Sequence, residues 1–533
     1  AEQKGNMVVV QAELNNTVQP EYSSWTAALI SNIKPSGVAI GENIVGPERT
    51  AGNGISAILK FPLDLQPDGS VRLVIGGDLS DPNKAKEVVT RVMANYDSFY
   101  KEKMDWYNHI ATNLTNVDTP EPVLNDAWFW SKMSLDWMTT TSPILGTGVV
   151  AGYQDFPWYF GGDTDVSIPG MLMAGLHEQA KAALLIFAPI GKVSRGRIPH
   201  ELIPNGSIYS HGHIMETTLW VKAIWETYMW TGDDKFLKEL YPICIDGMLD
   251  YVLSQPSRDG FILMEYEDLP NSKRDKTCPA YIISGLDALG KMAVRLGDAE
   301  TAKKCAFENA KFRSQVEDFF WSEEFGVYAT FIDDDNKPLL RDDRGWPAGT
   351  FCAPASVAYA MAGDASRVNR ALDYLERPEY NSDWGLYLSW NKDCLMPITH
   401  GQAAIGEFNY NRLEQGMRYV RDIAKTTHHF MPGALPEYTT PDGDPTKFDP
   451  IWCFCQLWSA ANLTEGMMWG LLHIEPDAAR KTVTITPRLP KGWDRMEFTN
   501  IIVGDTRFNV KVEGGTTTVT SVSGPELDIT VKE

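Results

Sequence analysis

The sequence predicts a mainly α-helical protein in which paired helices form an (α/α) barrel between two β regions. Three observations lead to this prediction. Short β-rich runs occupy the first 78 residues, helical spacing extends from about residue 119 to residue 472, and alternating strands return after Pro476. Long loops with Gly, Pro and Trp join the helices, which favours a barrel with functional loops at one end. The spacing alone leaves an open solenoid as the alternative.

The N-terminal region, residues 1–80, is expected to form a β-sandwich-like unit. Three runs predict its strands: Val8–Val10, Ile58–Phe61 and Val71–Ile75. Asp68-Gly69 lies between the last two runs and is a hairpin signal. From Pro82 the residues have helical spacing, so residues 81–118 are predicted to be a linker helix.

The central region, residues 119–475, is expected to form the barrel, because ten of its segments have apolar residues at helical spacing. These segments are residues 126–138, 170–188, 215–232, 234–255, 279–297, 299–321, 354–363, 366–375, 412–425 and 454–472. Between two of them, residues 327–340 predict a hairpin. Its Asp333–Asp335 run is interpreted as a solvated turn, with a cation site as the alternative.

The C-terminal region, residues 476–533, is predicted to be a small antiparallel β cap domain. Apolar and polar residues alternate in five runs, and glycines separate several of them. The runs are residues 481–487, 498–504, 506–515, 516–524 and 527–533.

Composition excludes several classes of protein. The 533 residues carry a net charge of −22, so a partner with a phosphate backbone or an anionic membrane surface is not expected. No run approaches the 18 apolar residues of a membrane span. The first fourteen residues show no signal-peptide pattern, and the seven scattered cysteines do not form a disulfide framework. A cytoplasmic location is expected. Cys453 and Cys455 are interpreted as buried thiols rather than metal ligands.

The aromatic content is high, with 17 Trp, 20 Tyr and 21 Phe. A large aromatic core explains most of it, and a cleft lined with rings that stack on sugars is the alternative. The densest cluster is Trp158-Tyr159-Phe160-Gly161-Gly162-Asp163-Thr164-Asp165, placed just before the helix of residues 170–188. Asp and Thr in front of a helix are ordinary caps. A carboxylate in a tight loop lined with rings would instead have a raised pKa, which a general acid needs.

Two further loops carry candidate groups. Glu437 lies in a loop rich in Pro and Gly, where a solvated glutamate is the simpler interpretation. Residues 196–201 include His200 and Glu201, and His211-Gly212-His213 follows with Glu216. His-x-His near a Glu could bind a metal, but no further histidine joins the group, which favours contacts to a polar substrate.

These motifs resemble, in their order along the chain, those of the amylo-α-1,6-glucosidases. FGGDTDVSIPGML is similar to that family's F-G-R-D-T-x-I-S-L-P-G pattern. GRIPHEL, followed by ETTLW, is similar to its G-x-I-P-N and D-A-S-L-W sections. TGDDKFL is similar to its T-G-D section. GALPEYTTPDGDP with QLWSAANL is similar to G-x-I-P-E with Q-A-W-S. The resemblance covers residues 120–472 and implies an (α/α)6 barrel and inverting glycosidase chemistry. The C-terminal strands also look like the cap of α-L-rhamnosidases.

The resemblance implies Asp163 as general acid and Glu437 as general base. Inversion requires two carboxyls about 6.5–9.5 Å apart. Three positions depart from the family pattern, since Gly162, His200 and Glu216 replace Arg, Asn and Asp, and these changes leave the identity of the sugar open. The residues expected to hold the sugar are Trp158, Tyr159, Phe160, Asp165, His200, Glu201, His213, Glu216, Trp384, His400 and Trp452. Trp346 is a further candidate, with a core position as the alternative.

The sequence therefore predicts an inverting, exo-acting α-glycosidase, and an α-glucosidase first among these. Its expected partner is an oligosaccharide or another glycoside. No organic cofactor is expected, because no phosphate-binding or dinucleotide fingerprint occurs, and no metal is expected. The alternatives are the same barrel acting on a rhamnoside, a mannoside or a glucosylated small acid. A sugar epimerase or a polysaccharide lyase, with His211, His213 or His400 moving the proton, also remains, because fold does not fix function.

Overall fold

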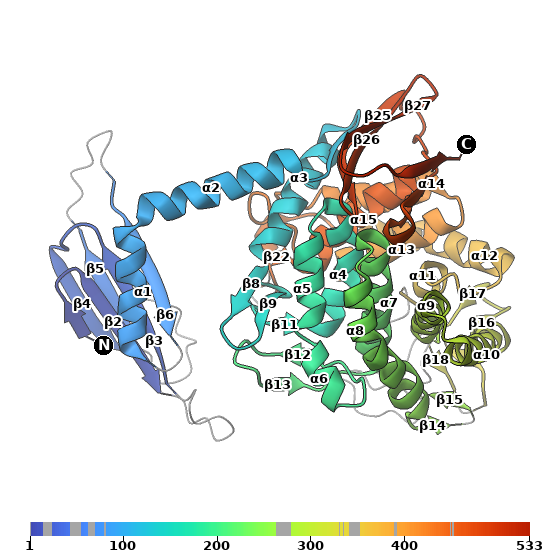
Figure 1. Ribbon diagram of the computed structural model, residues 1–533, viewed down its shortest axis with the longest axis horizontal. Coiled ribbons are helices and arrows are strands. Elements are labelled where there is room, and N and C mark those ends of the chain that lie inside the picture. The colour runs from blue at the N-terminus through green and yellow to red at the C-terminus, as the bar shows by residue number, and fades with distance from the viewer. Residues whose placement is uncertain are drawn as a thin grey trace. The chain divides into compact units, whose positions relative to one another are not determined.

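The computed structural model describes residues 2–13, 24–42, 55–61, 70–78, 81–258, 260–262, 279–329, 331–333, 335–339, 352–388, 392–447, 449 and 452–532. The chain divides into two compact units, Ala1–His109 and Ile110–Glu533 (Figure 1). Each unit has its own core. Trp346, Asp334 and Asp68-Gly69, which the sequence singled out, lie outside the described residues.

The first unit is a β-sheet packed against a helix. β1 (Glu2–Lys4), β2 (Met7–Glu13), β3 (Ser24–Ser31) and β6 (Leu73–Asp78) form an antiparallel sheet in that order, and β4 (Gly37–Glu42) pairs with β5 (Ile55–Lys60). The described strands on either side of Asp68-Gly69 pair with other strands, β5 with β4 and β6 with β3.

The segment predicted to be one linker helix is two helices. α1 (Pro82–Ala94) begins at an Asp81 cap and ends at Asn95, and α2 (Tyr96–Asn113) follows. α1 buries Ala85 and Val89 in a cluster with Val9, Ala28, Ile30 and Val74 of the sheet. Because this apolar face packs on strands, α1 is part of the core of the first unit.

The second unit contains the predicted (α/α)6 barrel, which is confirmed. Six inner helices contact one another in ring order and close the ring: α4 (Gly161–Ala174), α7 (Ile214–Thr231), α9 (Ala280–Leu296), α11 (Cys352–Tyr359), α13 (Pro397–Asn409) and α15 (Leu457–Leu472). Six outer helices alternate with them: α3 (Pro122–Trp137), α5 (His177–Leu185), α8 (Asp234–Ile245), α10 (Ala299–Gln315), α12 (Ala365–Leu375) and α14 (Leu413–Ala424) (Figure 1).

The sequence determines which helices lie inside. α4 and α15 are buried over nearly their full length, polar residues included, as a helix in the middle of a barrel must be. They approach closely at Gly170, where an added Cβ would lie 2.1 Å from the Ala461 carbonyl oxygen. Thr464 Oγ1 donates a 2.9 Å hydrogen bond to the Gly170 oxygen at the same crossing. Outer helix α10, by contrast, buries only Cys305 and Phe312.

Two predicted helix boundaries differ from the structure. The helix expected at 170–188 is divided, because Gly175 adopts a left-handed conformation and ends α4 before α5 begins. α4 also starts nine residues earlier than expected, at Gly161. None of the ten predicted helices covers Pro397–Gly401, whereas this segment is the first turn of α13, with Pro at a position that helix starts favour.

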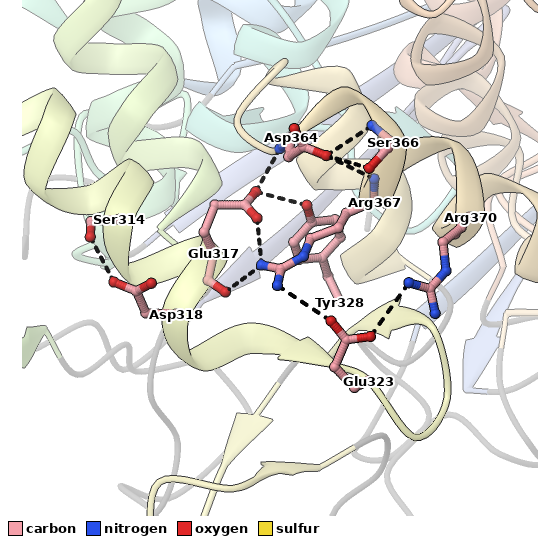
Figure 2. A network of polar contacts seen from close by, with 9 residues as sticks. All are labelled: Ser314, Glu317, Asp318, Glu323, Tyr328, Asp364, Ser366, Arg367 and Arg370. Carbon is pink, nitrogen blue, oxygen red and sulfur yellow. Dashed lines mark hydrogen bonds and ion pairs between the residues drawn. The ribbon is translucent and has the colours of Figure 1, made fainter.

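A polar network ties the end of α10 to the start of α12 (Figure 2). Glu317 accepts 2.8 Å hydrogen bonds from Arg367 Nη1 and from the Tyr328 hydroxyl. Its carboxyl also accepts from the backbone N–H of Asp364, the residue that caps α12. The predicted hairpin lies beside it, with β16 (Trp321–Ser322) paired to β17 (Val327–Tyr328) and β18 (Phe331–Ile332) to β19 (Pro338–Leu339).

The C-terminal strands form two small sheets. One has the order β27 (Thr516–Ser523), β26 (Thr506–Glu513), β25 (Arg495–Val503) and β7 (Asn116–Asp118), so a strand from before the barrel completes it. The other joins β23 (Glu475–Asp477), β24 (Thr482–Ile485) and β28 (Asp528–Val531). The cap is mixed rather than purely antiparallel, because β24 and β28 run parallel. Within the described parts of the chain, no helix has the length and apolar character needed to span a bilayer.

Candidate active site

A cavity of about 890 Å³ lies among the segments that precede or begin four inner helices, α4, α7, α13 and α15. Carboxylates, histidines and aromatic rings share its wall. The lining residues are Phe156, Phe160, Asp163, Arg197, His200, Glu201, Tyr209, Ser210, His211, Met396, Glu437, Tyr438, Gln456 and Trp458. The cavity thus contains both carboxyls that the sequence singled out for acid and base roles.

Asp163 lies in the first turn of α4, not in a loop before the helix as expected. β11 (Tyr159–Phe160) pairs with β12 (Glu201–Leu202), and the Gly161 N–H donates to the His200 oxygen at 2.8 Å, which fixes the start of the helix. Asp163 is 5% exposed. Gln456 Nε2 donates a 2.9 Å hydrogen bond to its Oδ1.

Glu437 reaches the cavity from the loop between α14 and α15. Its backbone N–H donates to the Cys453 oxygen at 2.9 Å, and the Cys453 N–H donates to its Oε2 at 3.1 Å. Burial raises the pKa of Glu437 to about 7, with the negative charges of Asp163 and Asp155 adding to the effect and the Cys453 N–H opposing it. A carboxyl with this pKa exchanges a proton near neutral pH.

His200 is held at the cavity wall by Glu216. The His200 Nδ1 and Glu216 Oε1 atoms are 2.8 Å apart, and the backbone N–H of His213 donates to Glu216 Oε2 at 2.7 Å. Burial raises the pKa of Glu216, but the contact with His200 and the backbone N–H groups of His213 and Glu216 together outweigh burial, so the pKa is lowered. Glu216 and His213 do not line the cavity; together they form the capping box of α7. Their position makes them supports for His200.

Of two neighbouring aromatic residues, Phe160 lines the cavity and Trp158 does not. The Trp158 and Phe160 rings stack with centroids 5.7 Å apart, and Trp158 Nε1 donates to Glu201 Oε2 at 2.7 Å. Phe160 meets His200 edge to face at 5.1 Å. Tyr159 points elsewhere, because successive residues of a strand face opposite sides, and its hydroxyl is 3.2 Å from Thr140 Oγ1.

Four other predicted sugar contacts do not line the cavity. Asp165 is fully buried with neither carboxyl oxygen hydrogen-bonded, and burial, with Glu216 and Asp163 nearby, raises its pKa well above the usual range. Two residues along a helix point in different directions, which takes Asp165 off the cavity wall. His400 is also buried, with Nε2 3.1 Å from the Leu386 oxygen. Trp384 packs on His429 and Trp452 on Tyr438.

Several lining residues were not predicted as site residues: Phe156, Arg197, Tyr209, Ser210, Met396, Tyr438, Gln456 and Trp458. His211 was predicted only for the epimerase or lyase alternative. Arg197, Tyr438, Gln456 and Trp458 lie inside motifs quoted from the sequence, so position within those motifs was a usable signal. Phe156 and Met396 carry no such signal, because their place at the cavity depends on the closed ring.

No described group of three or more His, Cys, Asp or Glu side chains is arranged to hold a metal ion. His211 lines the cavity mouth, whereas His213 caps α7. Cys453 and Cys455 are buried free thiols, as predicted.

Two family models match parts of the chain. Residues 132–263 match the model of amylo-alpha-1,6-glucosidase, and residues 479–533 match the C-terminal domain of glycosyl hydrolase family 65. The first match confirms the resemblance predicted from the sequence. No curated protein matches the chain by sequence.

Solved structures share the fold at low sequence identity. A family GH78 rhamnosidase of Bacillus sp. GL1 is 12% identical with a TM-score of 0.60, covering 96% of this chain and 53% of its own. A bacterial glucoamylase complexed with acarbose is 15% identical with a TM-score of 0.60, covering 84% of this chain and 71% of its own. A putative kojibiose phosphorylase from the human microbiome is 12% identical with a TM-score of 0.58, and the match covers 99% of this chain and 75% of the phosphorylase.

The chain spans about half the length of the rhamnosidase that it matches. These likenesses concern the fold, while the two family matches connect parts of the chain to glycoside-processing families. The second unit is therefore an (α/α)6 barrel of the kind found in glycoside-processing enzymes, with a segment similar to amylo-α-1,6-glucosidases.

Proposed function

We propose that this protein is an inverting, exo-acting α-glycosidase, with α-glucosides as its substrates. The observation that carries the proposal is that Asp163 and Glu437 line one cavity although they lie in distant parts of the sequence. An inverting glycosidase needs such a pair, one carboxyl to protonate the leaving oxygen and one to deprotonate a water. The segment match to amylo-alpha-1,6-glucosidase supports the choice of an α-glucoside.

Glu437 is proposed as the general base. Its Oε2 accepts the Cys453 N–H, so Oε1 is the oxygen proposed to take the proton from water. A pKa of about 7 makes Glu437 a stronger base than an exposed glutamate while leaving much of it ionised at neutral pH. The attacking water displaces the leaving group from the opposite face, and no covalent intermediate forms.

Asp163 is proposed as the general acid, which gives a proton to the glycosidic oxygen as the bond breaks. The Gln456 hydrogen bond holds its carboxyl in the cavity. Phe156, Phe160, Tyr438 and Trp458 supply ring faces for the sugar, and His200 and Glu201 supply polar contacts to its hydroxyls.

A panel of 4-nitrophenyl glycosides tests the proposal. The α-glucoside is expected to be cleaved, and NMR of the first product is expected to show the β-anomer of glucose. First release of the α-anomer would exclude inversion. Cleavage of an α-rhamnoside or an α-mannoside instead would keep the chemistry and change the sugar. Epimerisation, or an unsaturated product, would assign the cavity to an epimerase or a lyase.

A further inference from the structure

Arg197 is the only lysine or arginine among the described residues that line the cavity. It stands out in a chain whose net charge is −22 and in a cavity that also contains Asp163, Glu201 and Glu437. It occupies the variable position of the Gly-x-Ile-Pro motif. A permanent cation in an acidic cavity favours ligands that carry a negative charge at the position of the cation.

The structure holds the Arg197 guanidinium in a fixed orientation. Nε donates a 3.1 Å hydrogen bond to the Gly212 oxygen, and Nη2 donates to the same oxygen. Gly212 is fixed in turn, because its φ of +74° suits glycine and an added Cβ would lie 2.3 Å from the Ile198 oxygen. The guanidinium also lies over the Tyr251 ring at 5.5 Å.

These contacts use the Nε–Nη2 edge of the guanidinium, and the Nη1–Nη2 edge takes no part in them. No described carboxylate forms an ion pair with Arg197, whose guanidinium contacts the Gly212 oxygen and the Tyr251 ring. The remaining edge has two parallel N–H donors, the geometry that binds a carboxylate or a phosphate in bidentate fashion.

The stretch of chain that carries Arg197 extends to the exposed side of the cavity. Asp163 and Glu437 are 5% and 6% exposed, whereas Tyr209, which lines the cavity with Ser210 and His211, is 73% exposed. Arg197 and these three residues lie on one stretch of chain, residues 197–211. In an exo-acting site the released sugar occupies the closed end and the leaving group faces the mouth, so a group bound at Arg197 belongs to the leaving part.

We infer that this site takes α-glycosides whose leaving group carries a carboxylate or a phosphate, and that Arg197 binds that anion. The inference rests on the proposed function and narrows its substrate class. The buried Asp163 and Glu437 carboxyls disfavour an anion beside them, so the same charge arrangement also sets the direction in which the substrate enters.

The test compares two α-glucosides with matched leaving groups, 3-carboxy-4-nitrophenol and 3-carbamoyl-4-nitrophenol. The full chain is expected to prefer the carboxylate by about 10–100-fold in kcat/KM, the usual worth of a charge-assisted hydrogen bond. Arg197→Gln is expected to abolish the preference while still cleaving the neutral substrate. Arg197→Lys is expected to keep part of it. Lys192→Gln removes an exposed cation outside the cavity and is expected to leave the preference unchanged.

A salt titration of the unmodified chain gives a readout that needs no variant. Added NaCl is expected to raise KM for the carboxylate substrate and to leave KM for the carbamoyl substrate unchanged, because screening weakens only the charged contact. Equal kcat/KM values for the two substrates at low salt would overturn the inference and leave the glycosidase proposal standing. Failure to cleave either α-glucoside would overturn the proposed function itself.

Two other outcomes would place the anion elsewhere. Preference for an α-glucuronide with a neutral leaving group would put the anion on the released sugar and overturn the inference. Cleavage that requires inorganic phosphate and yields a sugar phosphate would assign Arg197 to free phosphate, and it would overturn both the inference and the hydrolase mechanism.

Discussion

Gln456 joins the two halves of the proposed catalytic pair, since its side chain donates a 2.9 Å hydrogen bond to Asp163 Oδ1 from a position 293 residues further along the chain. Its backbone N–H donates at 2.8 Å to the oxygen of Leu435, two residues before Glu437. Gln456 is 1% exposed. A single residue at the start of α15 therefore sets the position of the Asp163 carboxyl relative to the Glu437 loop.

Gln456→Leu is expected to lower kcat on 4-nitrophenyl α-glucoside by tenfold or more, with a smaller change in KM. The substitution removes the donor that holds Asp163, and misplacement of a reacting group costs rate more than binding. Gln402→Leu is the matched control, because Gln402 is a buried glutamine on α13 that contacts the Tyr281 hydroxyl at 3.3 Å. Equal losses in the two variants would show a general effect of burying leucine.

The pH dependence of kcat/KM is expected to show an acid limb near pH 7. Burial raises the pKa of Glu437 to about 7, and a general base must be ionised to accept a proton. Activity should therefore fall about tenfold per pH unit below this value. Initial rates at substrate concentrations far below KM measure it. A loss of activity as pH rises through 7 would make Glu437 the acid and reverse the two roles.

Glu437→Gln is expected to lower kcat by about 10²–10⁴-fold while sugar binding is retained. Glutamine keeps the shape and can still accept the Cys453 N–H, but it cannot take a proton from water. Isothermal titration with a non-hydrolysable glucoside analogue checks binding. Added azide is expected to restore turnover and to yield the β-azide from an α-glucoside. Recovery of the α-azide would reveal a covalent intermediate and contradict inversion.

The same substitution is expected to stabilise the fold at high pH. The folded-state pKa of Glu437, about 7, lies above the ordinary value of 4.5, so the folded chain binds this proton more tightly than the unfolded chain does. Its contribution to stability therefore falls as pH rises from about 4.5 to about 7, by on the order of 3 kcal/mol in all. Glu437→Gln and the unmodified chain should melt alike at pH 4, with the variant higher at pH 8. A difference independent of pH would contradict this account.

Asp163→Asn and Asp165→Asn are expected to behave differently. Loss of the general acid should abolish cleavage of an alkyl glucoside but spare much of the cleavage of a 2,4-dinitrophenyl glucoside, whose leaving group needs little protonation. Asp165 is buried with its pKa raised well above the usual range, so the uncharged asparagine should replace it with less than a tenfold change. Rescue by the good leaving group in Asp165→Asn alone would transfer the acid role to Asp165.

The sequence by itself determined the order of β, α and β regions and the two motifs that carry Asp163 and Glu437. Periodicity reports which face of a segment is apolar, and it predicted most outer and inner helices for that reason. It did not predict the break at Gly175, the early start of α4 or the helix at Pro397–Asn409, because a left-handed glycine and tertiary contacts decide where helices begin and end.

The tertiary structure decided which side chains share the cavity. Closing the ring brings α15 against α4, which places Gln456 on Asp163 and Arg197 at the same cavity as Glu437. It also made Asp165 and His400, which are chemically equivalent to the cavity-lining Asp163 and His200, buried groups that do not line the cavity. Composition and spacing show which chemical groups a chain contains. The direction in which each side chain points depends on its position around the helix and on contacts between residues hundreds of positions apart, and only the closed barrel fixes these.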